Sequence, residues 1–179
     1  MTRPATVVLV IDLQVGVLEG CFDVAGVVAR AVALVARARG EGVPVVWVQH
    51  EEAEMPHGSA GWQLMPSLVP APGEAMIRKT CCDAFVGTPL RDVLDGLGAK
   101  RLVLAGAQSD YCIRATAHRA VAEGYPIVLV GDAHTTADAC FGKVEIRGEQ
   151  IVAHLNRSIG GLACPGIAVD LATHDAVTF

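Results

Sequence analysis

The sequence predicts an α/β fold: a three-layer, doubly wound, six-stranded and mainly parallel sheet with helices on both faces. Short apolar runs alternate with segments of helical periodicity along all 179 residues. The apolar runs are continuous rather than alternating, which is typical of strands that are covered on both faces. A hydrophobic share of 52% in a chain of this length suffices for one domain, residues 1–179, with a full core.

Each element of the first half is predicted by its own local pattern. A β-branched run that stops at Asp12 indicates the first strand, and a 3.6-residue apolar period that stops before Gly40 indicates the first helix. Pro44 is tolerated because it lies at the start of the second strand. In chain order we expect a strand at Thr6–Ile11, a helix at Val24–Ala38, a strand at Val43–Val48, a short strand at Ala75–Ile77 and a helix at Leu90–Leu97.

The second half repeats the same alternation. A buried apolar run precedes a short polar turn and then a helical pattern, and a glycine pair ends the last helix. Right-handed crossovers between such strands produce a parallel sheet. We expect a strand at Arg101–Ala107, a helix at Cys112–Glu123, a strand at Ile127–Val130, a helix at Ile151–Ile159 and a strand at Ile167–Leu171.

One long irregular segment, from His50 to about Ile77, interrupts this alternation and is rich in Gly, Pro and Met. A loop of this length in a compact domain is more often functional than idle. We expect it to supply a pocket wall, a lid or a subunit contact.

Composition excludes several classes of function. A formal net charge of −5 gives no basic field, so nucleic acid and anionic membranes are not expected as partners. No apolar run reaches the roughly 18 residues that span a bilayer, and no signal-peptide pattern is found, so a cytoplasmic protein is expected. The six cysteines lack zinc-ligand spacing, and a chain with an ample core has little need of disulfides.

Cys112 is the cysteine whose position suggests chemistry. It follows the Arg101–Ala107 strand and opens the next helical segment. Free N–H groups and the helix dipole favour a thiolate at such a junction, and a thiolate is a strong nucleophile. Without further support, a buried structural thiol is an equally good interpretation.

Two charged residues complete a possible catalytic set with Cys112. Asp12 ends the first strand, and Lys79 follows the short Ala75–Ile77 strand. Ligands of open α/β sheets collect at the carboxyl ends of the strands, where these residues are expected to lie. Asp12 would accept the thiol proton and Lys79 would influence both groups by its charge. Backbone N–H groups at Tyr111 and Cys112 would face the oxyanion.

The chain resembles the isochorismatase-like cysteine hydrolase superfamily over nearly its whole length. The matching segments are VVLVIDLQ, KTCCDAFVGTPLRDVLDGLG, AGAQSDYCIRATAHRAVAEGY and IVLVGDAHTT. The resemblance implies an Asp–Lys–Cys triad, carried over as Asp12, Lys79 and Cys112, and a homo-oligomer. It also implies a non-proline cis peptide bond at Ala107–Gln108, in the loop that precedes the nucleophile.

Several positions differ from the pattern of this superfamily. Ser109 stands where many members have Thr, and Asp83 stands where many have Ser. The similar nicotinamidases carry an Asp-x-His metal motif after the second strand, whereas this chain has Gln49-His50-Glu51-Glu52. We therefore expect no metal and no cofactor. Members that cleave the vinyl ether of isochorismate can lack the cysteine, so the presence of Cys112 favours amidase chemistry.

Four further residues are candidates for the substrate pocket. Gln14 either orients Asp12 or contacts substrate, or else binds loop backbone, and His50 at the end of the second strand either contacts substrate or packs in the core. The aromatic side chains of Trp62 and Phe85 either wall the pocket or belong to the core.

The sequence favours a cysteine hydrolase that cleaves a C–N bond of a small amide, ureido or lactam-type substrate. Two alternatives stay open: an isochorismatase-type vinyl-ether hydrolase that uses Asp12 as acid, and a non-catalytic binding or redox-sensing protein on the same fold. A dinucleotide-binding protein is disfavoured because DLQVGVLEG after the first strand contains no GxGxxG turn.

Overall fold

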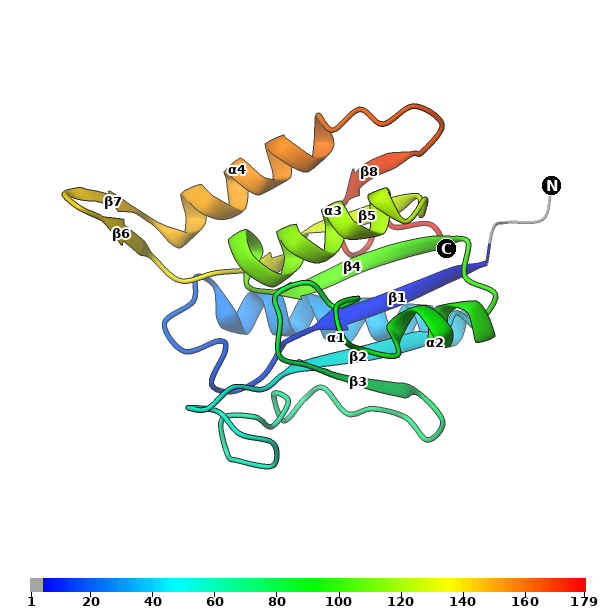
Figure 1. Cartoon of the computed structure of the whole chain (residues 1–179), viewed down its shortest axis with the longest axis horizontal. Coiled ribbons are helices and arrows are strands. Elements are labelled where there is room, and N and C mark those ends of the chain that lie inside the picture. Colours follow the sequence, from blue (N-terminus) through cyan, green and yellow to red (C-terminus); the bar gives the residue numbers. More distant parts are fainter. Residues whose placement is uncertain (1–4) are drawn as a thin grey trace.

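A computed structural model of the chain describes residues 5–179, so the first four residues of the predicted 1–179 domain lie outside it. Six strands form one sheet in the order β3-β2-β1-β4-β5-β8, and every neighbouring pair is parallel (Figure 1). The predicted fold class is confirmed. The strands are β1 (Thr6–Ile11), β2 (Val45–His50), β3 (Ala75–Lys79), β4 (Arg101–Ala107), β5 (Ile127–Thr135) and β8 (Val169–Ala172).

The order of the strands places a topological switch point between β1 and β4. From β1 the chain adds β2 and then β3 on one side, and from β4 it adds β5 and then β8 on the other. The loops that leave β1 and β4 at their carboxyl ends therefore diverge and leave a crevice between them. Asp12 begins one of these loops and Cys112 lies in the other.

Helices cover both faces of the sheet, and the alternation of side chains along β1 shows how. Val8 and Val10 pack into a cluster with α1, whereas Val7, Leu9 and Ile11 pack into a second cluster with the other helices. Figure 1 shows α1 behind the sheet and α2, α3 and α4 on the opposite side. The helices are α1 (Val24–Gly40), α2 (Leu90–Gly96), α3 (Arg114–Ala122) and α4 (Gly148–Gly160), and a π-helical turn η1 (Ser109–Ile113) precedes α3.

Gly106 allows β4 to approach β1 closely beside the switch point. Its φ is +141°, and a Cβ atom at this position would lie 1.9 Å from the carbonyl oxygen of Ile11. Any side chain would push the two strands apart where they pair, at Ile11 and Gly106. This glycine therefore brings the loop that contains Cys112 next to Asp12.

The structure departs most from the predicted elements in three places, and most other bounds differ from the prediction by one to three residues. β5 continues to Thr135, and a small antiparallel hairpin of β6 (Ala139–Phe141) and β7 (Val144–Ile146) projects from the body (Figure 1). The segment expected as a helix from Cys112 begins earlier, as η1. Among residues 5–179, no helix has the length and apolar character needed to cross a bilayer.

Candidate active site

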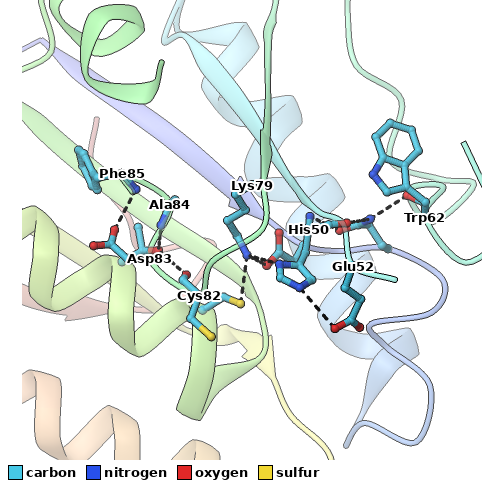
Figure 2. A network of polar contacts seen from close by, with 12 residues as sticks. His50, Glu52, Trp62, Lys79, Cys82, Asp83, Ala84 and Phe85 are labelled. Carbon is cyan, nitrogen blue, oxygen red and sulfur yellow. Dashed lines mark hydrogen bonds and ion pairs between the residues drawn. The ribbon is translucent and has the colours of Figure 1, made fainter. Parts of the chain in front are cut away.

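Asp12, Lys79 and Cys112 meet at the carboxyl edge of the sheet. Asp12 follows β1 in a left-handed backbone conformation, with φ of +51°. Lys79 is the last residue of β3 and pairs in register with His50 of β2. Figure 2 shows the Lys79 side chain directed from β3 toward His50 and the cluster. The three residues, predicted from separate segments, therefore form one group.

The Lys79 ammonium lies at the centre of this group. Its Nζ is 2.5 Å from Asp12 Oδ2, and both side chains are fully buried. It donates a hydrogen bond to Cys112 Sγ at 3.2 Å and lies 3.2 Å from His50 Nδ1. One cation thus contacts the acid, the thiol and the imidazole together.

The Asp12 carboxylate is in an environment that makes it a base. Burial raises the pKa of Asp12 above its ordinary value, and the charge of Lys79 opposes this effect only in part. The Lys79 ammonium, 2.5 Å from Oδ2, is the main partner of this buried carboxylate, and the Cys112 thiol is a second, weaker one. A desolvated carboxylate of this kind accepts a proton readily.

The surroundings of the Cys112 thiol oppose its ionisation. Burial, followed by the nearby Asp12 charge, raises the pKa of Cys112 well above its usual range, and Lys79 offsets only part of this. Desolvation thus opposes the thiolate that a helix N-terminus would favour. The Asp12 charge also raises the pKa of Lys79 against the effect of burial, so this residue stays cationic.

A buried hydrogen-bonded relay holds the turn that carries Cys112. Asn156 of α4 donates from Nδ2 to the carbonyl of Gly131 at 2.8 Å, so its Oδ1 is an acceptor for His134 Nε2 at 2.9 Å. His134 Nδ1 must then accept the Ser109 hydroxyl proton at 2.7 Å. Burial lowers the pKa of His134, in agreement with a neutral ring. The relay ties η1 to β5 and α4.

The loop before Cys112 contains the cis peptide bond Ala107–Gln108, at the position that the resemblance implies. The Gln108 side chain donates to the carbonyl of Val17 at 3.0 Å, which joins this loop to the one after β1. The N–H of Tyr111 donates to the carbonyl of Gln108 at 3.2 Å. That amide is already bonded within the turn, so it is not free to face an oxyanion as expected.

A cavity of about 310 Å³ opens onto the cluster. Asp12, Cys112 and His50 line it, and Gln108 and Tyr111 form part of its wall. Sequence reasoning missed its other lining residues, which are Gly16, Val17, Glu52 and Cys82. The one available signal was that Glu52 lies two residues beyond the end of β2.

Three predicted pocket residues serve other purposes. Gln14 is fully buried, and its side-chain amide is hydrogen-bonded to backbone groups. Its oxygen accepts from the His50 N–H, and its nitrogen donates to the carbonyls of His50 and Trp62. Trp62 packs edge-on against His57, and Phe85 is a core residue near Tyr125. Figure 2 shows Phe85 pointing away from Lys79. These three residues do not line the cavity.

The donor atoms at the cluster do not fit a metal ion. One ligand atom each from Asp12, His50 and Cys112 lies within 4.8 Å of the others. However, Lys79 Nζ contacts all three of these side chains, so an ammonium occupies the position that a metal would take. All six cysteines are free thiols.

Comparisons with known proteins agree on one family. The isochorismatase domain family matches residues 6–147. A streptothricin hydrolase from Streptomyces noursei is 38% identical over 143 residues, covering 76% of this chain and 56% of that protein. A ureidoacrylate amidohydrolase RutB from Methylorubrum extorquens is 27% identical, covering 72% of this chain and 69% of that protein.

A solved structure of an isochorismatase from Pseudomonas putida superimposes with a TM-score of 0.87 at 26% identity. It covers 99% of this chain and 94% of that one. The chain spans about half the length of the streptothricin hydrolases that it matches.

Proposed function

The chain belongs to the isochorismatase family. From this premise we propose that it is a hydrolase that cleaves a C–N bond of a small amide, ureido or lactam-type substrate through a Cys112 thioester. The observation that carries the proposal is the position of Lys79 Nζ, 2.5 Å from Asp12 Oδ2 and 3.2 Å from Cys112 Sγ. A general base and a nucleophile thus line one cavity, and a buried cation contacts both of them.

The first half of the reaction forms the thioester. Asp12 takes the proton of the Cys112 thiol as the sulfur attacks the carbonyl carbon, so the thiolate exists only while the new bond forms. The positive charge of Lys79 stabilises the sulfur during this transfer. Because the Tyr111 N–H is bonded to Gln108, we assign the oxyanion contact to the Cys112 N–H. Protonated Asp12 then gives its proton to the leaving nitrogen, and the C–N bond breaks.

The second half of the reaction releases the acid. Water gives a proton to Asp12 and attacks the thioester carbonyl, and the C–S bond breaks. The sulfur then recovers its proton from Asp12. The raised pKa of Asp12 suits both directions of transfer, since the group can hold a proton between the two steps.

Two substitutions at one position test this mechanism. Cys112→Ala and Cys112→Ser are assayed for amine release over a panel of carboxamides, ureido compounds and lactams. Both are expected to abolish turnover, whereas Cys82→Ala, which removes another thiol that lines the cavity, is expected to retain it. Undiminished turnover by Cys112→Ala would contradict the thioester.

The same variants separate the alternatives. Vinyl-ether hydrolysis with Asp12 as acid predicts pyruvate release that survives Cys112→Ala. A non-catalytic redox sensor predicts oxidation of Cys112 without turnover of any substrate in the panel. A cytoplasmic location and a homo-oligomer, both expected from the sequence, stay predictions that cell fractionation and light scattering test.

A further inference from the structure

His50 has a ring nitrogen that the proposed reaction does not use. The Lys79 ammonium has N–H donors and no acceptor, and its contacts are Asp12 Oδ2, Cys112 Sγ and His50 Nδ1. Nδ1 of His50 must therefore accept a hydrogen bond from Lys79. In the neutral imidazole the ring proton then lies on Nε2, so the other edge of the ring is a hydrogen-bond donor.

This donor faces the cavity. Figure 2 shows the His50 ring between Lys79 and Glu52, with the edge opposite Nδ1 directed away from the buried ammonium. His50 and Glu52 both line the cavity. The Glu52 carboxylate is 3.8 Å from Nε2, which is beyond hydrogen-bond distance. Among residues 5–179, no group accepts a hydrogen bond from Nε2, so the proton is available to a ligand.

The direction of this N–H is fixed by contacts around His50. The fully buried side chain of Gln14 accepts from the His50 N–H at 2.7 Å and donates to the His50 carbonyl at 2.9 Å. The next N–H along the chain, that of Glu51, donates to the carbonyl of Lys79 at 2.9 Å. Backbone and Nδ1 are thus both held before a ligand binds, and a donor held in this way binds its acceptor at little cost in entropy.

The order of the strands indicates which part of a substrate this donor meets. Across the carboxyl edge of the sheet the order is Lys79 on β3, His50 on β2, Asp12 after β1 and Cys112 after β4. In the proposed reaction the oxyanion lies at the Cys112 N–H, and the leaving nitrogen takes its proton from Asp12. The leaving nitrogen is therefore on the β1 side of the carbonyl, and the group attached to it continues toward β2 and His50.

We infer that His50 selects the leaving amine: its Nε2–H donates a hydrogen bond to an oxygen on the amine side of the scissile C–N bond. This inference rests on the proposed function, which places the carbonyl at Cys112 and the leaving nitrogen at Asp12. The substrate class is an N-substituted amide or a lactam whose amine portion carries an ether, carbonyl or hydroxyl oxygen. An apolar amine portion leaves the Nε2–H without an acceptor in the complex and binds less well.

The position of the ring proton is tested in the protein without ligand. Nitrogen NMR of the imidazoles distinguishes protonated from unprotonated ring nitrogens, and comparison with His50→Asn identifies the signals of His50 among those of the six histidines. We expect Nδ1 to have the shift of an acceptor nitrogen and Nε2 that of a protonated one. A proton on Nδ1 and none on Nε2 would overturn the inference.

Three amides of equal size test the selection of the leaving amine. N-methoxyethyl pentanamide has an ether oxygen on the amine side, N-butyl methoxypropanamide has it on the acyl side, and N-butyl pentanamide has none. We expect kcat/KM of the wild type to be higher for the amine-side ether than for N-butyl pentanamide by roughly fivefold, as for one hydrogen bond. His50→Asn keeps an acceptor for Lys79 but lacks the Nε2–H. This preference should therefore disappear in His50→Asn, through KM rather than kcat.

A second histidine of the same loop provides the matched control. His57 packs against Trp62 and does not line the cavity, so His57→Asn should keep the preference for the amine-side ether. The acyl-side ether should respond to His50→Asn no more than N-butyl pentanamide does. Equal kcat/KM for the amine-side ether and N-butyl pentanamide in the wild type, or a preference that survives in His50→Asn, would overturn the inference.

Binding without turnover separates this inference from the proposed function. Dissociation constants of the three amides are measured by calorimetry with Cys112→Ala, alone and combined with His50→Asn. If Cys112-dependent hydrolysis shows no preference for the amine-side ether, the inference fails and the proposed function stands. If the wild type cleaves none of the amides, yet Cys112→Ala binds the amine-side ether more tightly and His50→Asn removes that difference, the contact with His50 stands and the proposed function fails.

Discussion

Two carboxylates at opposite ends of β3 are each paired with a cation, yet their environments differ. Glu74 precedes the strand and receives two hydrogen bonds from Arg39, one from Trp47 Nε1 and one from the N–H of Ala71. Asp12, next to Lys79 at the other end, is paired with that ammonium and the Cys112 thiol and has no further donor among the described residues.

The pKa values of the two groups move in opposite directions. Four donors outweigh the cost of burial and lower the pKa of Glu74 from 4.5 to about 2. At Asp12 the effect of burial exceeds that of the Lys79 charge, so the pKa of Asp12 is raised. A carboxylate whose acceptors are filled is a structural link, whereas one whose acceptors are left open is available for proton transfer. The difference distinguishes a stabilising ion pair from a reactive one.

The largest expected effect comes from Asp12→Asn. The amide keeps the shape of the side chain but cannot take the thiol proton, so turnover of any accepted amide should fall by about 10³-fold. The urea midpoint is measured beside kcat to show that the variant is folded. Glu74→Gln is the matched control and should keep kcat. Comparable losses of kcat in both variants would show that Asp12 has no role in turnover that Glu74 lacks.

The second effect is the acid limb of the pH profile. Asp12 must be ionised to act as base, so kcat/KM should decline as the pH falls through a value above 3.8, the ordinary pKa of this group. The same raised pKa means that the stability contribution of Asp12 is present at low pH and is lost as the pH rises through its folded value. An acid limb with its midpoint at or below pH 3.8 would contradict the assignment of Asp12 as a desolvated base.

The third effect is on stability rather than on turnover. Because the pKa of Glu74 is lowered from 4.5 to about 2, its contribution is present above the unfolded value and is lost as the pH falls toward 2. Glu74→Gln should lower the unfolding free energy at neutral pH by about 1–3 kcal/mol. Urea unfolding across this pH range should show a flatter curve for the variant. Parallel curves for the wild type and the variant would show that ionisation of Glu74 does not cause the change of stability with pH.

The smallest effect is expected for Arg39→Lys. A lysine keeps the charge but cannot make both hydrogen bonds of 2.8 Å that Arg39 donates to Glu74. Since Arg39 is partly exposed, the loss should be about 0.5–1 kcal/mol in urea unfolding, with kcat unchanged. A loss as large as that of Glu74→Gln would mean that Trp47 and Ala71 contribute little.

The sequence predicted the buried parts of the fold best. The strands Thr6–Ile11 and Arg101–Ala107 have the expected bounds because continuous burial leaves a continuous apolar run. The β6–β7 hairpin was missed since its side chains, such as Phe141 at 88% exposed, pack against no core. Hydrophobic periodicity in a sequence reflects which side chains are buried, so it does not predict a hairpin whose side chains are exposed.

The site was predicted in its central residues and, through His50, Gln108 and Tyr111, in part of its walls. Asp12 and Cys112 could be placed because strand ends converge in a parallel sheet, whereas Lys79 had no local signal of its own. Gln14 and Phe85 were candidates for the pocket, yet tertiary packing places them against backbone and core. The protonation of Cys112 could not be predicted, because burial and the charge of Asp12 depend on the folded arrangement.

The contrast between the two carboxylates matters only if the base at Asp12 serves a covalent reaction at Cys112. The most direct measurement is intact mass and peptide mapping of protein that is acid-quenched during turnover of an accepted amide. We predict an acyl adduct on Cys112 that is absent from Asp12→Asn and present in Glu74→Gln. Steady turnover with no adduct, or an adduct on a different residue, would contradict the account.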